Sequence, residues 1–127
     1  MAKAKILVID DNPFICKLMA SRLSANDYQI STATSGAEGL KKAADEKPDL
    51  ILLDFTIPDM DGIQIGKKLR ETENTKNIPI IMVTARNEHS LVVKVMEGFT
   101  PAAYVVKPFN PEKLLHEVER VLNSNKE

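Results

Sequence analysis

Residues 50–62 read Leu-Ile-Leu-Leu-Asp-Phe-Thr-Ile-Pro-Asp-Met-Asp-Gly. Four successive apolar residues predict a short strand that is buried on both faces, as in the centre of a parallel sheet. Asp54 follows this strand directly, while Asp61 and Gly62 are suited to the start of a helix. The stretch therefore predicts a strand, a loop that opens with an acidic residue, and a helix.

Short apolar runs of this kind recur along the whole chain. They predict five strands, at residues 6–9, 28–33, 50–53, 78–83 and 102–106. Helical patterns separate the strands and follow the last one. Strict alternation of strand and helix favours right-handed crossovers, so we predict a doubly wound α/β fold with a parallel sheet and helices on both faces.

Residues that cap helices mark where each helix begins. Asn12 and Asn110 each precede a proline, and Ser35 with Glu38 forms a capping box whose carboxylate reaches back toward the helix start. Asp61 is the expected cap of the third helix. A fourth helix is predicted at about residues 88–97, with an apolar stripe made of Leu91, Val92, Val95 and Met96.

Length and composition limit the possible functions. The 127 residues suit a single domain, and 17 Lys and Arg residues against 18 Asp and Glu residues leave a net charge of −1. This balance argues against a surface for nucleic acid or anionic membrane and favours protein partners. The only cysteine, Cys16, excludes an internal disulfide. With no signal peptide or long apolar segment, we predict a cytoplasmic protein.

The residues at the strand ends form the most informative group, because ligands of open α/β sheets bind at the carboxyl ends of the strands. A parallel sheet would bring these residues to one edge. Three carboxylates there would repel one another unless a cation and a lysine offset their charge. Oxygen ligands favour Mg²⁺, so the site suits phosphoryl chemistry. The residues in question are Asp10, Asp11, Asp54, Thr84 and Lys107.

Four motifs, taken together, resemble the receiver domain of response regulators in two-component signalling, the CheY-like superfamily. The resemblance covers about residues 5–122 of a single domain, 1–127, with no output domain in the chain. It implies a flavodoxin-like, five-stranded parallel sheet in the order 2-1-3-4-5. The motifs lie at residues 8–13, 54–62, 84–85 and 104–109.

The resemblance also implies a role for each site residue. Asp54 would accept the phosphoryl group, and Thr84 and Lys107 would bind the phosphoryl oxygens. Mg²⁺ would be held by Asp10, Asp11 and Asp54, with Asp11 the direct ligand of the acidic pair, and by the backbone carbonyl of Thr56. Tyr104 would switch its rotamer on phosphorylation, the Lys107–Pro108 peptide would be cis, and the side chains of Thr56 and Arg86 would tune the phosphate lifetime.

By the same resemblance, a sensor histidine kinase or a histidine phosphotransfer protein supplies the phosphoryl group. Phosphorylation would then alter a protein-binding surface made by the fourth helix, last strand and fifth helix. The downstream target stays open, and no direct contact with nucleic acid or membrane is expected. The chain would not be an enzyme, apart from catalysing its own phosphorylation and dephosphorylation.

Three other functions are alternatives to this interpretation. A receiver that signals without phosphate would act only as an interaction module. The presence of the complete set of site residues argues against it; these are Asp11, Asp54, Thr84 and Lys107. A Mg²⁺-dependent phosphatase with an aspartate nucleophile would place a second acid where Thr56 stands. A flavodoxin-like cofactor binder would not place acids after the first strand, where they repel a phosphate. His89 and His116 are expected at the surface.

Overall fold

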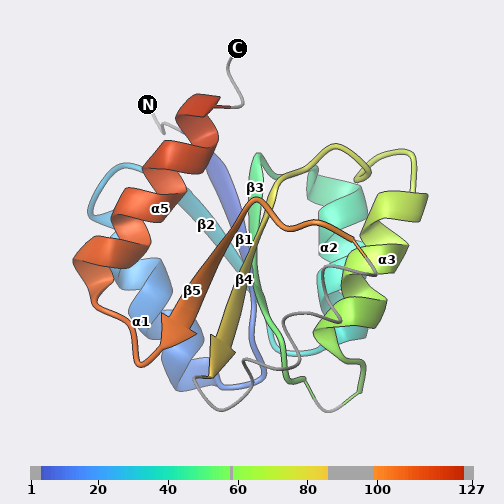
Figure 1. Cartoon of the computed structure of the whole chain (residues 1–127), viewed down its shortest axis with the longest axis horizontal. Coiled ribbons are helices and arrows are strands. Elements are labelled where there is room, and N and C mark those ends of the chain that lie inside the picture. The colour runs from blue at the N-terminus through green and yellow to red at the C-terminus, as the bar shows by residue number, and fades with distance from the viewer. Residues whose placement is uncertain (1–3, 58, 86–98, 125–127) are drawn as a thin grey trace.

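A computed structural model describes residues 4–57, 59–85 and 99–124 and shows a five-stranded parallel sheet in the order β2-β1-β3-β4-β5 (Figure 1). The predicted fold and strand order are confirmed. The predicted fourth helix, Arg86 and His89 lie outside the described residues. The strands are β1 (Lys5–Ile9), β2 (Gln29–Ala33), β3 (Leu50–Asp54), β4 (Ile80–Ala85) and β5 (Ala103–Lys107); the described helices are α1 (Pro13–Ser24), α2 (Gly36–Glu46), α3 (Gly62–Glu71) and α5 (Pro111–Ser124).

Helices cover both faces of the sheet, α1 and α5 on one side and α2 and α3 on the other (Figure 1). Side chains of a strand point alternately to its two faces. In β1, Ile6 and Val8 accordingly join the core beneath α1 and α5, whereas Leu7 and Ile9 join the core beneath α2 and α3. This explains why β1 and β3 have unbroken apolar runs, at residues 6–9 and 50–53. Among the described residues, no helix is long and apolar enough to cross a bilayer.

The observed limits of β4 differ from the prediction of residues 78–83. Ile78 is buried but lies in a turn, where its amide donates to the carbonyl of Thr75. The strand begins at Ile80 and continues to Ala85, because its last residues pair with β5 beyond the end of β3. Thr84 is therefore the penultimate residue of β4 and not the first residue after the strand.

The four predicted caps hold, with one correction. Oxygens of Asn12, Ser35 and Asn110 accept backbone amides of their helices, and Asp61 forms a full capping box with Gln64. The correction concerns Glu38. Its carboxylate accepts the amide of Thr34 at 2.8 Å instead of the amide of Ser35, so it reaches back one residue further than a capping box requires.

A close contact between α3 and the segment before β5 restricts one position to glycine. A Cβ atom built on Gly66 would lie only 2.0 Å from Cε1 and 2.2 Å from Cζ of Phe99. Phe99 is itself buried, so its ring has little room to move away. The missing side chain at Gly66 is what allows Phe99 to pack against α3.

We predict that Gly66→Ala lowers the free energy of unfolding by about 1–3 kcal/mol, because the overpacking outweighs the helix propensity gained. Urea denaturation of the variant and the wild type measures this difference. In a Phe99→Ala background the clash is gone, and the same Gly66→Ala change should be neutral or stabilising. Equal stability of Gly66→Ala and the wild type would contradict the packing argument.

Candidate functional site

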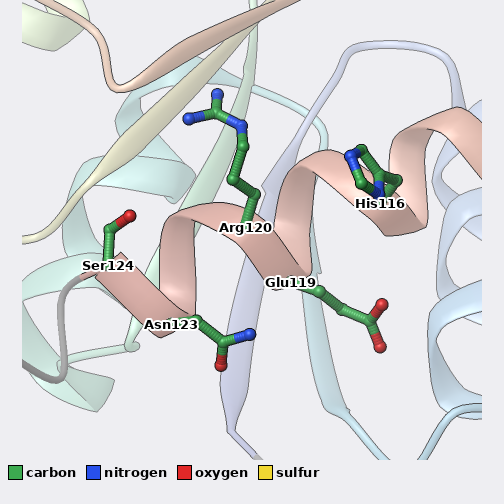
Figure 2. A pocket seen from close by; sticks show the side chains of 5 residues that line it. All are labelled: His116, Glu119, Arg120, Asn123 and Ser124. Carbon is green, nitrogen blue, oxygen red and sulfur yellow. The ribbon is translucent and has the colours of Figure 1, made fainter.

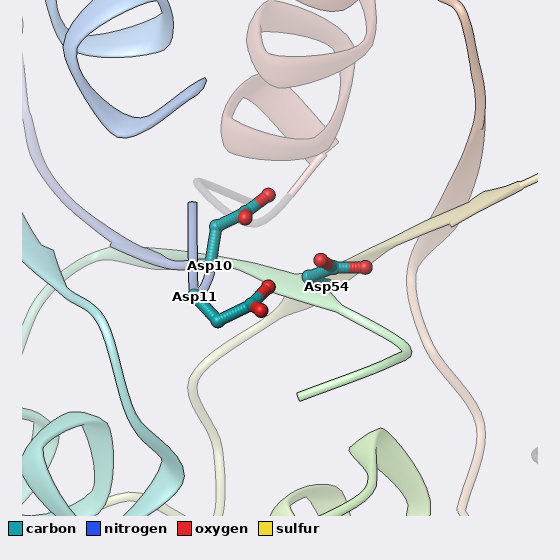
Figure 3. A group of neighbouring side chains, drawn as sticks. All are labelled: Asp10, Asp11 and Asp54. Atoms are coloured by element: carbon teal, nitrogen blue, oxygen red, sulfur yellow. The ribbon is translucent and has the colours of Figure 1, made fainter. Parts of the chain in front are cut away.

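The three acidic residues predicted to meet do lie together at the carboxyl ends of β1 and β3 (Figure 3). Asp10, Asp11 and Asp54 each offer one carboxylate oxygen, and these oxygens lie within 4.8 Å of one another. Asp10 and Asp54 are buried, whereas Asp11 is exposed. The cluster could hold a metal ion that approaches from the side of Asp11.

Lys107, at the end of β5, supplies positive charge to this cluster. Its Nζ atom lies 3.2 Å from Oδ2 of Asp54 and 3.4 Å from Oδ2 of Asp10. The other carboxylate oxygens accept backbone amides: Oδ1 of Asp54 that of Thr56 at 3.3 Å, and Oδ1 of Asp10 that of Asn12 at 2.9 Å. Each buried carboxylate thus faces the ammonium group with one oxygen and its own loop with the other.

These contacts do not fully offset the cost of burying the charge. Burial first, and the nearby Asp10 second, raise the pKa of Asp54 to about 6, although Lys107 and the amide of Thr56 lower it. For Lys107, burial lowers the pKa, but Asp54 and Asp10 outweigh it and the net pKa is raised. The lysine therefore stays charged, and the three acids retain an excess of negative charge that a cation would offset.

The remaining predicted residues occupy the neighbouring strands. Thr84 is buried, and its partner across the β4–β5 ladder is Val106, next to Lys107. The Lys107–Pro108 peptide is cis, as predicted. Thr84 and Lys107 thus flank the cluster from adjacent strands, on the side away from β1.

Tyr104 lies on β5 and packs against the core that α2 and α3 cover. Its hydroxyl oxygen is buried, and within the described part of the chain it has no hydrogen-bond partner. Burial raises the pKa of this hydroxyl. An unpaired buried hydroxyl costs about 1–3 kcal/mol, so the inward position of Tyr104 is held by packing and opposed by desolvation.

Two contacts near the site were not predicted from the sequence. The thiol of Cys16, buried on α1, donates to the carbonyl oxygen of Asp10 at 3.3 Å, and burial together with Asp10 raises its pKa to about 11. The carboxylate of Asp59 accepts the amides of Gly36 and Ala37, at 2.8 and 3.1 Å. Neither contact has a signal in the sequence, because both join residues brought together only by the fold.

A pocket lies along α5 (Figure 2). His116 is exposed there, as predicted. Neighbouring Arg120 pairs with Glu117 at 2.8 Å on the helix surface. The lining comes from one helix and includes no member of the acidic cluster, so this pocket is not part of the candidate site. The lining residues are His116, Glu119, Arg120, Asn123 and Ser124.

Comparison with known proteins gives a consistent result. A family model described as the response regulator receiver domain matches residues 6–119. Two relatives from Bacillus subtilis are 41% and 38% identical: the alkaline phosphatase synthesis transcriptional regulatory protein PhoP and the transcriptional regulatory protein ResD. The matches cover 93% and 94% of this chain but 48% of each relative, so the chain spans about half the length of the curated relatives it matches.

Solved structures show the same fold. The chemotaxis response regulator CheY4 of Vibrio cholerae superposes with a TM-score of 0.84 at 32% identity, covering 93% of this chain and 98% of that one. NtrX from Brucella abortus gives a TM-score of 0.89 at 26% identity, covering 99% of this chain and 28% of that one. The similarity therefore extends over nearly all of the chain.

The raised pKa of Asp54 predicts that its charge destabilises the metal-free fold. The pKa lies above the value of about 3.9 expected for an unfolded chain, so stability falls as the pH rises from about 4 to about 6. Asp54→Asn removes that charge and should be about 1–2 kcal/mol more stable than the wild type at pH 7, in EDTA. The advantage should vanish near pH 4.

Thermal or urea unfolding at the two pH values measures this effect. Asp45→Asn, which neutralises an exposed acid on α2, serves as the control and should behave like the wild type at both pH values. A destabilised Asp54→Asn variant at pH 7 would show that the contact with Lys107 outweighs the cost of burial.

Proposed function

This chain belongs to the response regulator receiver domain family, and from that premise we propose that Asp54 accepts a phosphoryl group in two-component signalling. The observation that carries the proposal is the convergence of Asp10, Asp11 and Asp54 within 4.8 Å, with Lys107 bonded to Asp54. The set combines a nucleophilic carboxylate, an oxygen-rich cation site and a fixed positive charge. Phosphoryl transfer to a carboxylate requires these three elements.

The proposed metal is Mg²⁺, and the donor set fits it. Asp10, Asp11, Asp54 and the backbone carbonyl of Thr56 would hold the ion, with Asp11 as the direct ligand of the first pair. All of these donors are hard oxygens, which Mg²⁺ prefers. The sulfur of Cys16, beside Asp10, belongs to a buried thiol that donates to a carbonyl. Bound Mg²⁺ would supply positive charge to the phosphoryl oxygens.

In the proposed reaction, a carboxylate oxygen of Asp54 attacks the phosphorus of the donor. The new P–O bond forms as the donor's P–N or P–O bond breaks, and the leaving group departs with the electron pair. Lys107 would stabilise charge on the transferring group, because its Nζ atom already lies at the carboxylate. Thr84 would donate its hydroxyl to a phosphoryl oxygen. Arg86 and Thr56 are proposed to affect access of the water that later cleaves the acyl phosphate.

Phosphorylation is proposed to change the position of Tyr104. The phosphoryl group would draw Thr84 toward the end of β3, which leaves space beside β5. The hydroxyl of Tyr104 is buried and unpaired among the described residues, so turning outward would allow it to bind water. The affected surface includes β5 and α5, where we expect the downstream protein to bind.

The donor is proposed to be a sensor histidine kinase or a histidine phosphotransfer protein in the cytoplasm. The curated relatives are named as transcriptional regulatory proteins and are about twice as long as the match. The downstream protein therefore stays open, and the role proposed for this chain is the phosphorylated switch. Apart from its own phosphorylation and dephosphorylation, no enzymatic activity is proposed.

Intact-mass spectrometry after incubation with acetyl phosphate and Mg²⁺ tests the proposal. The wild type should gain one phosphoryl group that hydroxylamine removes, as expected for an acyl phosphate. Asp54→Ala should gain none, and EDTA should abolish the gain in the wild type. Asp45→Asn controls for loss of an acid and should be modified normally. Two results together would refute the proposal: the folded wild type stays unmodified, and its spectrum does not change when beryllofluoride is added.

A further inference from the structure

We propose that Asp59 is a positioning residue for the phosphorylation site, because its carboxylate ties the segment that carries Thr56 to the beginning of α2. The inference rests on the proposed function and adds a residue to it. Asp59 lies 22 and 23 residues from its two partners, so the tie joins separate parts of the fold. It does not touch the reacting atoms and acts through the backbone.

The contact itself is well formed. Oδ1 of Asp59 accepts the amide of Gly36 at 2.8 Å, and Oδ2 accepts the amide of Ala37 at 3.1 Å. These are the first two residues of α2, whose amides have no partner within the helix. A carboxylate is also favoured at a helix N-terminus by the helix dipole. Both hydrogen bonds lower the pKa of Asp59, so its carboxylate is ionised near neutral pH. We call this pair of hydrogen bonds, from Gly36 and Ala37 to Asp59, the clamp.

Glycine at position 36 permits this close approach. A Cβ atom built there would lie 2.9 Å from Cβ of Met60, the residue after Asp59. Asp59 and Met60 therefore both rest against the start of α2. Two further hydrogen bonds hold the rest of this segment. The amide of Thr56 donates to Oδ1 of Asp54, and the amide of Gly62 donates to the carbonyl of Phe55 at 2.8 Å.

The clamp connects the two sides of the proposed metal site. The start of α2 follows β2, and β2 is bonded to the end of β1 through the amide of Asp10 and the carbonyl of Ala33, at 3.0 Å. Asp10 and Asp11 stand on that side, whereas Asp54 and Thr56 stand on the other. By joining the segment of Thr56 to α2, Asp59 fixes the distance between the two groups of oxygens. Mg²⁺ tolerates little deviation from octahedral geometry, so this distance matters.

If Asp59 were only a cap of α2, it would have the same contacts but would not affect the metal site. Ser35 also caps α2, accepting the amide of Glu38 at 3.1 Å, yet it lies outside the segment that carries Thr56. Ser35→Ala therefore removes a cap of the same helix and leaves the clamp in place. It is the matched control for Asp59→Ala.

The experiment measures the Mg²⁺ dependence of phosphorylation by acetyl phosphate and, separately, Mg²⁺ binding by calorimetry without a phosphoryl donor. Loss of groups that orient metal ligands commonly weakens metal binding tenfold or more. Asp59→Ala should raise the half-saturating Mg²⁺ concentration about tenfold and change the rate at saturating Mg²⁺ less than about twofold. Asp59→Asn keeps one acceptor and should fall between. Ser35→Ala should lose stability but keep the wild-type Mg²⁺ requirement.

Two outcomes would overturn the inference: an unchanged Mg²⁺ requirement in Asp59→Ala, or an equal increase in Asp59→Ala and Ser35→Ala. These differ from failure of the proposed function, in which the wild type itself is not phosphorylated. In that event the calorimetric comparison of wild type, Asp59→Ala and Ser35→Ala still decides whether Asp59 positions a metal site.

Discussion

The ammonium group of Lys107 makes the acidic edge of the sheet possible. It lies 3.2 Å from Oδ2 of Asp54 and 3.4 Å from Oδ2 of Asp10, and both residues are buried, where an unpaired charge is costly. Lys107 ends β5, whereas Asp54 ends β3 and Asp10 follows β1. The long side chain therefore spans β4, and the contact depends on the sheet order β1-β3-β4-β5. The topology thus determines which charges meet.

One lysine does not balance three carboxylates, and this deficit links stability to function. The pKa of Asp54 stays raised despite two hydrogen bonds to its oxygens, so the folded chain keeps an ionised group in an unfavourable place. A domain selected only for stability would have an amide or apolar residue there. This cost agrees with the proposed function, in which the site attracts a cation and then accepts a phosphoryl group. Local rules are often broken at functional sites for this reason.

Much of this arrangement was predictable from sequence because it depends on burial and on chain order. Apolar runs located all five strands, and capping residues located the helix starts. The start of β4 was misplaced because Ile78 is buried without being part of the strand, and an apolar pattern reports burial without reporting which backbone groups are paired. The tie from Asp59 to α2 and the packing of Phe99 on Gly66 could not be predicted. They depend on distances between segments that are remote in sequence.

The aspartates near the sheet edge show that surroundings decide what a carboxylate does. Asp59 and Asp61 each accept amides at a helix start, where negative charge stabilises the fold. Asp54 lies a few residues earlier and is destabilised by burial and by Asp10. These two acids stabilise the beginnings of α2 and α3. The destabilised carboxylate of Asp54 is held by the loop that follows it, because one of its oxygens accepts the amide of Thr56.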